Sequence, residues 1–261
     1  MTLPSQREIM SPRLLKVAER AKRDPKGPIL SLASLIDEPA LMRAFDRIRS
    51  DAAKGVDGVS KEQYGQNLKV KLRDLYERLK SKRYRHQAIR RVHIPKENGK
   101  TRPIGVSTIE DKVVQNALRE VLEVVHEPMF YEASYGFRPG RSAHDALRVF
   151  DRMLHEREVS WMIEADIQSY FDSIDRTKLK EMLRLRVADE SMLRHIGKCL
   201  YVGVLDGAEY SEPEEARCRG RRCRRCWATS IYITYSTTGW RPKCVRDCAA
   251  ACVSSAMRMI S

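Results

Sequence analysis

The first 215 residues of this 261-residue chain contain a single cysteine, Cys199, and no apolar run in the chain approaches the length of a membrane span. The segment from Met1 to Arg13 lacks the apolar core of a signal peptide. These absences argue against a membrane protein and against a secreted one. We therefore expect a cytoplasmic chain that binds no membrane.

The charge of the chain is strongly positive and unevenly distributed. Hydrophobic residues make up 42% of the sequence, enough for a core, and the net charge is +14. A basic chain of this kind favours a polyanionic partner, most often nucleic acid, although a merely basic surface has the same composition. Residues 1–215 hold 39 Lys and Arg against 34 Asp and Glu, whereas residues 216–261 hold 10 against 1. The last segment is therefore a different kind of sequence.

The mixture of helix and strand patterns predicts an α+β fold, because it contains no regular strand–helix–strand repeat. Helices are expected over 38–53, over 61–82, from the cap at Thr108, from the cap at Ser142 to Glu156, after Asp175 and over 192–200. A β-hairpin is expected over 89–106 and a half-buried strand over 159–166, while residues 54–59 form a glycine-rich turn.

Two of the expected helices have clear apolar faces. In the helix over 61–82 the inward side chains are Leu68, Leu72, Leu75, Tyr76 and Leu79. In the helix that follows Thr108 they are Val114, Ala117, Leu118, Val121 and Val125. Both helices should contribute to one core.

The expected strand over 159–166 ends on an acidic residue that two aromatic residues follow. Asp166 closes the apolar strand, and Tyr170 and Phe171 come shortly after it. A strand end can hold a carboxylate rigidly for a divalent ion, and the next backbone carbonyl can reach the same ion. The alternative is a solvated aspartate that caps the following helix.

The expected hairpin places cations on both sides of a tight turn. Asn98-Gly99 is a strong two-residue turn signal, with Lys96 before it and Arg102 after it. That arrangement can direct one ammonium and one guanidinium at a triphosphate. An exposed basic hairpin without a ligand is the alternative.

A glycine-rich loop with aromatic and basic residues, Tyr135 to Ser142, leads into a helix N-terminus. Backbone amides, the helix dipole and arginine together suit a phosphate group. We therefore assign Arg138 and Arg141 to nucleic-acid binding. An ordinary loop and helix cap is the alternative.

Taken together, the order and spacing of these three patterns resemble the fingers and palm of group II intron reverse transcriptases, also called maturases. The matching stretches are Ile94 to Val106, Tyr135 to Ser142 and Ala165 to Asp172. Residues 55–59 and the helix after them resemble the N-terminal extension of that family. The resemblance implies right-hand polymerase fingers and a partial palm, with an incomplete antiparallel palm sheet and packed helices.

The resemblance also implies a role for five residues. Asp166 would be the first metal-binding carboxylate, and Ile167 would offer its carbonyl to the second ion. Phe171 would be the steric gate under the sugar, while Lys96 and Arg102 would hold the incoming triphosphate. The implied reaction is two-metal phosphoryl transfer with Mg²⁺, the ions lying about 3.5–4 Å apart.

The partners implied by the resemblance are an RNA template, group II intron RNA and deoxynucleoside triphosphates. Basic helix residues would follow the template backbone, unless they form an ordinary solvated face. They are Lys69, Lys71, Arg73, Lys80 and Lys82.

Two motifs of the family are missing from the chain. One is Tyr-Ala-Asp-Asp, which supplies the remaining carboxylates, and the other is Gln-Gly followed by Ser-Pro-Leu-Leu, which lines the nucleotide site. After Glu215 the sequence turns into an Arg/Cys-rich stretch instead. With one catalytic carboxylate of the set, we expect this chain to be inactive as a polymerase.

The missing motifs reappear when residues 215–261 are read in a shifted frame. If the third base of each codon joins the first two of the next, Cys226-Trp227 must give Leu and Met259-Ile260 must give Asp. With permitted codons, the stretch after Glu215 then yields Gln-Gly-Ser-Ala-Leu-Ser-Pro-Leu-Leu, and the last residues yield Tyr-Ala-Asp-Asp-Phe. We therefore expect a one-base deletion near codons 215–216.

The tail has two alternative interpretations. Cys223 and Cys226 have zinc-knuckle spacing, and Cys244, Cys248 and Cys252 could complete four ligands. A basic RNA-binding tail is the other alternative.

Four segments follow from these patterns. They are a basic lead-in over 1–35 that is mobile or forms short helices, an N-terminal extension over 36–88, reverse transcriptase fingers and partial palm over 89–215, and an aberrant tail over 216–261. The expected function is that of an RNA-directed DNA polymerase fragment. A non-catalytic RNA-binding protein that acts in intron splicing is the alternative.

Overall fold

The structure is a computed structural model that describes residues 10–95, 99, 101–156, 159, 161–162, 175–207 and 209–211, without the side chain of Arg102. Its helices are α2 (Pro12–Arg23), α3 (Glu38–Asp46), α4 (Lys61–Gly65), α5 (Leu68–Lys80), α6 (Ile109–His126), α7 (Ala143–Glu156), α8 (Arg176–Arg184) and α9 (Glu190–Leu200). Its strands are β1 (Ile89–Pro95), β2 (Thr101–Val106), β3 (Val204–Asp206) and β4 (Glu209–Ser211). The fold is therefore a mixture of helices and a small sheet, which confirms the α+β class.

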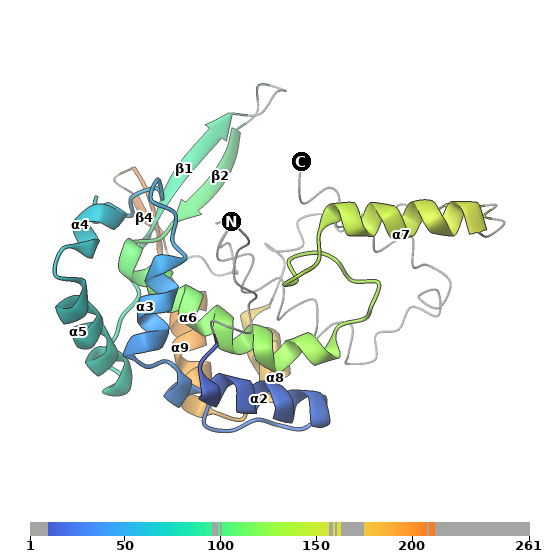
Figure 1. The fold of residues 1–261 in the computed structure, drawn as a ribbon. Helices are drawn as coiled ribbons and strands as arrows, with labels where there is room; N and C mark the ends of the chain where they lie inside the picture. The colour runs from blue at the N-terminus through green and yellow to red at the C-terminus, as the bar shows by residue number, and fades with distance from the viewer. Residues whose placement is uncertain are drawn as a thin grey trace.

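The four strands form one sheet in the order β2-β1-β3-β4. β1 and β2 are the expected antiparallel hairpin, which rises away from the helices in Figure 1. β3 pairs with β1 in parallel, with Ile89 opposite Val204, and β4 pairs with β3 in antiparallel fashion. The expected antiparallel palm sheet would use residues 159–166 and later ones, so it falls mostly outside the described residues.

The core surrounds helix α6. All five residues that we assigned to its inner face are at most 3% exposed, which confirms that prediction. α6 lies among α2, α3 and α9 in Figure 1, and side chains from all of these helices share one apolar cluster. Among the described residues, no helix is long and apolar enough to cross a membrane.

The lead-in contributes to this core. Ser11 caps α2, and Leu14 and Ala21 of that helix are buried. Arg186, itself 2% exposed, donates hydrogen bonds to the carbonyls of Ala21 and Asp24, and so ties the end of α2 to the segment after α8. Residues 12–23 therefore adopt the helical alternative that we gave for the lead-in.

Two expected helices are shorter than predicted. The helix over 38–53 ends at Asp46, and the ammonium of Lys61 accounts for this by donating to the carbonyls of Asp46 and Ile48. The helix over 61–82 divides into α4 and α5 at Asn67, which adopts a left-handed conformation with φ of 57°. Such ends are stable because lysine donors satisfy carbonyls that a continuing helix would have bonded.

The predicted strand over 159–166 is wrong where the structure describes it. Residues 159, 161 and 162 have no strand structure, and Trp161 is 90% exposed although it belonged to the predicted buried face. An alternating pattern shows which side chains a strand would bury, but burial also requires a neighbouring strand. None of the described strands pairs with these residues.

Candidate nucleotide and nucleic-acid site

The β1–β2 hairpin brings its two arms together as the sequence predicted. Its register places Ile94 opposite Arg102 and Pro95 opposite Thr101, so Arg102 is on the second arm, close to the turn. Gly99 has φ of +69°, the left-handed conformation that a tight turn demands and glycine adopts without strain. Lys96 and the side chain of Arg102 are outside the described residues, so their role remains a prediction.

Arginines at the base of the hairpin hold it against the rest of the molecule. The guanidinium of Arg90 donates twice to the carbonyl of Lys54, at 2.8 and 3.2 Å. Arg91 forms an ion pair with Asp206 of β3 at 3.3 Å. The hairpin is therefore anchored on both sides, in the turn over 54–59 and in the β3–β4 pair.

Arg138 organises the loop between α6 and α7 from within. Its guanidinium donates to the carboxylate of Glu127 at 2.7 Å and to the carbonyls of Tyr131 and Ser134 at 2.8 Å. It also lies over the ring of Phe130, 4.7 Å from the centroid. The side chain is 7% exposed, so these contacts give Arg138 a positioning role. Direct contact with nucleic acid remains a prediction.

Arg141 is more available than Arg138. Its guanidinium lies 5.2 Å from the ring centroid of Tyr135, which is itself buried, and donates one hydrogen bond to the carbonyl of Glu132. No acid in the described part of the chain forms an ion pair with it. A guanidinium that lies over an aromatic ring and has no ion-pair partner among the described residues suits a phosphate.

The N-terminus of α7 is capped by side chains of the chain itself, as the sequence also predicted. The carboxylate of Asp145 accepts hydrogen bonds from the backbone amide and the hydroxyl of Ser142, at 2.9 and 2.6 Å. The Ser142 hydroxyl accepts in turn from the Asp145 amide. These bonds from Ser142 hold the pKa of Asp145 below its usual value. The chain's own carboxylate therefore occupies this helix end, as in a capping box.

The predicted catalytic residues lie outside the described residues. They are Asp166, Ile167 and Phe171. A carboxylate and a backbone carbonyl are hard oxygen donors, which Mg²⁺ prefers. In the part of the chain that the structure describes, no group of three or more His, Cys, Asp or Glu side chains could hold a metal. The metal site is therefore a prediction from sequence.

Comparisons with known proteins agree with these patterns. Residues 94–223 match the family described as reverse transcriptase (RNA-dependent DNA polymerase). The chain is 36% identical over 205 residues to the protein YkfC of Escherichia coli, which covers 76% of this chain and 54% of that protein. It is 34% identical over 168 residues to the group II intron-encoded protein LtrA of Lactococcus lactis, covering 64% of this chain and 28% of LtrA. This chain belongs to the group II intron reverse transcriptases.

Further relatives of this reverse transcriptase chain are also intron proteins. The nuclear intron maturase 2 of Arabidopsis thaliana, a mitochondrial protein, is 27% identical over 116 residues, which are 44% of this chain and 15% of the maturase. The chain spans about half the length of the Escherichia coli relative and about a quarter of LtrA.

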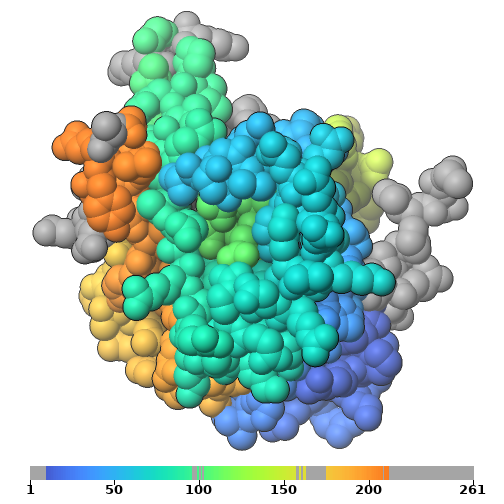
Figure 2. Space-filling view, turned by 90° about the vertical axis from the view of Figure 1, so that its left-hand side faces the viewer, coloured from blue at the N-terminus to red at the C-terminus, as the bar shows by residue number. Residues whose placement is uncertain are grey.

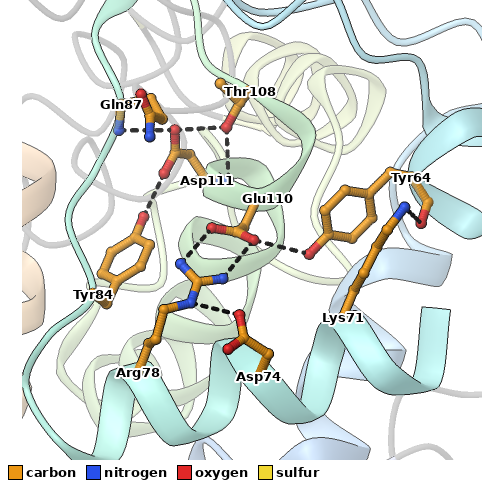
Figure 3. A network of polar contacts seen from close by, with 9 residues as sticks. All are labelled: Tyr64, Lys71, Asp74, Arg78, Tyr84, Gln87, Thr108, Glu110 and Asp111. Atoms are coloured by element: carbon orange, nitrogen blue, oxygen red, sulfur yellow. Dashed lines mark hydrogen bonds and ion pairs between the residues drawn. The ribbon is translucent and has the colours of Figure 1, made fainter. Parts of the chain in front are cut away.

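A polar network that the sequence did not reveal joins α4 and α5 to the start of α6. Arg78 of α5 forms a two-pronged ion pair with Glu110 at the start of α6, at 2.8 and 2.9 Å, and also bonds Asp74 (Figure 3). The hydroxyl of Tyr64 donates to the same Glu110. The hydrogen bond to Glu110 is the main cause that raises the pKa of Arg78.

Asp111 continues this network into the interior. Its carboxylate accepts from the hydroxyl of Tyr84 at 2.6 Å, the hydroxyl of Thr108 at 2.7 Å and the amide of Gln87 at 3.2 Å (Figure 3). Burial raises the pKa of Asp111, and these donors together with the nearby His86 oppose that rise. Because Gln87 lies two residues before β1, the network fixes where the hairpin leaves the helical body. The spacing of Thr108 and Asp111 predicted the helix cap. Nothing in the local sequence predicted that Tyr84 and Gln87 would bond Asp111.

Proposed function

We propose that this chain is the N-terminal part of an RNA-directed DNA polymerase that acts with a group II intron. The observation that carries the proposal is the match of residues 94–223 to the reverse transcriptase family, which includes the end of β1 and all of β2. In this proposal residues 89–215 are the fingers and part of the palm of a right-hand polymerase. RNA is the template, and deoxynucleoside triphosphates are the substrates.

The proposed residue roles follow the order of the motifs. Lys96 and Arg102 flank the hairpin turn and bind the triphosphate. Asp166 and the carbonyl of Ile167 bind Mg²⁺, and Phe171 selects the sugar. The register that sets Ile94 against Arg102 supports the first pair, because it puts Arg102 beside the turn that Lys96 enters.

We further propose that the reading frame changes near codon 215. The support is the recovery of both missing motifs, in order and in one shifted register, from residues 215–261. A polymerase needs the carboxylates of the second motif to complete its metal site. The chain as it stands should therefore incorporate no nucleotide.

A primer-extension assay on an RNA template tests this proposal. The present chain should give no labelled product, whereas a chain with one base restored at codon 215 and extended through its open frame should extend the primer. Asp166→Ala in the restored chain should abolish extension, while Asp175→Ala, which removes only the cap of α8, should retain it. Extension by the present chain that Asp166→Ala removes would contradict the proposal.

A second candidate function is RNA binding without catalysis, in intron splicing. The similarity to a nuclear intron maturase over 116 residues favours it. Filter binding to structured RNA, together with primer extension by the frame-restored chain, separates the two candidates. A restored chain that binds RNA but extends no primer supports the second function, and the absence of RNA binding argues against it.

A further inference from the structure

The connection between α5 and β1 crosses helix α9 and is fixed to it by a lysine. The ammonium of Lys198 donates to the carbonyls of Lys82, at 2.7 Å, and of Tyr84. It also lies 5.9 Å from the ring centroid of Tyr84. Lys82 has φ of 65°, so this segment turns sharply where it meets the helix. Lysine is an unusual choice for this contact, because it brings one more positive charge to a basic segment.

Four basic residues lie on the two segments that meet at this crossing, and we name them the α5–α9 cluster: Lys82, Arg85, Arg194 and Lys198. Arg194 and Lys198 are four residues apart on α9, a spacing that places two like charges on the same face. Lys82, Arg85 and Arg194 are exposed. Burial lowers the pKa of Lys198, and the charges of Arg194 and Arg85 lower it further.

No acid in the described structure forms an ion pair with any member of the cluster. The sequence contains no Asp or Glu between Glu77 and Glu97, nor between Glu190 and Asp206. Both segments that build the cluster are therefore free of local negative charge. Such a group of cations repels itself, and an anion that binds there would remove the repulsion.

The surroundings of the cluster favour a chain of phosphates over a single anion. Lys80 and Arg83 are exposed neighbours in the same acid-free segment. Lys69 and Arg73 add positive side chains further along α5, with the exposed Glu77 between Arg73 and Lys80. Figure 2 looks onto this side of the molecule, with α5 at its centre and the hairpin above it. A stripe of separated cations fits the repeated charge of a nucleic-acid backbone.

We propose that the α5–α9 cluster binds the phosphate backbone of structured RNA, on a surface separate from the hairpin turn and from Asp166. The inference rests on the proposed function, in which RNA is the binding partner, and adds a surface on which this RNA binds. It assigns Arg85 and Arg194 to RNA affinity, not to nucleotide incorporation.

The test compares two double variants of the full chain that lose the same charge. Arg85→Gln/Arg194→Gln alters the cluster, and Lys16→Gln/Lys22→Gln alters exposed lysines of α2. The probe is an RNA hairpin of mixed sequence, and its affinity is measured by fluorescence anisotropy over a range of salt concentrations. The cluster variant should bind about tenfold more weakly, with a salt slope lower by about 2, and the α2 variant should bind like the parent.

Thermal unfolding of the same proteins separates affinity from folding. Because the substitutions relieve repulsion, the cluster variant should unfold at the same temperature as the parent or higher. If that double variant does not fold, Arg194→Gln alone should still weaken binding several-fold. Equal affinity of the parent and the cluster variant, an equal loss in the α2 variant, or no binding by the parent would overturn the inference. Primer extension by the frame-restored chain, at saturating template, would still decide the polymerase proposal independently.

Discussion

At the residue scale, the chemistry of Arg138 illustrates what a motif leaves open. The sequence places it in a loop with glycine and aromatic neighbours, where an arginine can face either a ligand or the chain. In the structure its guanidinium donates four hydrogen bonds, to one carboxylate and two carbonyls, and lies over the ring of Phe130. The neighbouring Arg141 makes one such bond. The two arginines are three positions apart, but Arg138 holds the loop together whereas Arg141 is more available to a ligand. Only their contacts in the structure distinguish these roles.

Replacing Arg138 should destabilise the protein substantially. Arg138→Gln removes the buried cation from Glu127, so we expect a loss of about 2–3 kcal/mol in the free energy of unfolding. Arg138→Lys should recover little of it, because an ammonium cannot reproduce the planar donor geometry. Urea unfolding measures the loss, and Arg148→Gln is the control, since Arg148 is 75% exposed and its pair with Asp145 should contribute under about 1 kcal/mol. A loss in Arg138→Gln no larger than in that control would contradict the positioning role.

Buried His126 should make the fold sensitive to acid. Burial lowers its pKa to about 4, and its Nδ1 bonds the carbonyl of Leu122 at 2.9 Å. Since the unfolded chain binds this proton near pH 6.5, the contribution to stability is complete above that pH and is lost as the pH falls towards 4. The loss should reach about 3 kcal/mol, and burial of His195, whose pKa is also lowered to about 4, adds to it.

Urea unfolding at pH 7 and pH 4.5 tests the role of His126. His126→Asn should show a smaller drop between the two pH values than the parent. His155→Asn is the matched control, because the side chain of His155 is 77% exposed, and it should keep the parental drop. A His126→Asn protein with the full parental drop would show that another group causes the acid sensitivity.

At the element scale, the turn over 54–59 and the start of α6 depend on each other. A Cβ on Gly55 would lie 2.5 Å from Cα and 2.6 Å from the backbone nitrogen of Thr108, the N-cap of α6. Both atoms are backbone and cannot move aside alone, so Gly55→Ala should cost about 2 kcal/mol or more. Gly197→Ala in α9 should instead stabilise by about 0.5–1 kcal/mol, because a Cβ there meets no atom of the described residues within 4 Å. Thermal unfolding should shift the two variants in opposite directions, and a shift in the same direction would refute the close approach.

The elements that the sequence predicted well are those that local patterns determine. The turn signal at Asn98-Gly99 predicted the hairpin, and helical spacing predicted the inner face of α6. The parallel pairing of β1 with β3 had no such signal, because Ile89 and Val204 are far apart in the chain. The hydrogen bond from Tyr84 to Asp111 also had no local signal in the sequence. The exposure of Trp161 shows that an alternating pattern alone does not predict a buried strand when no other strand pairs with it.

The sequence likewise predicted only part of the candidate site. Residue types and spacing indicated the hairpin turn, and the structure confirms its arms and register. They also indicated the cap at Ser142, which the structure confirms through its bonds with Asp145. They could not show that Glu127 and two backbone carbonyls hold Arg138 within the loop. The roles of Lys96, Arg102, Asp166, Ile167 and Phe171 stay predictions.

At the scale of the whole molecule, distant segments share one core. Ile29 pairs with Val187 through the backbone, and Arg186 bonds the end of α2, so the lead-in and the region after α8 are joined. Side chains of α2, α5, α6 and α9 belong to the same apolar cluster. The predicted boundaries at residues 35 and 88 therefore separate sequence motifs. They do not separate packing units, because side chains from both sides of each boundary share one core.

The central claim is that this chain is a group II intron reverse transcriptase whose reading frame changes near codon 215, before the second catalytic motif. The nucleotide sequence across codons 210–261 and about a kilobase beyond tests it most directly. The claim predicts that the shifted frame continues through Tyr-Ala-Asp-Asp into a long open frame. Stop codons that interrupt the shifted frame within this interval would contradict it, and zinc or RNA binding by the Arg/Cys-rich tail would then be the question to pursue.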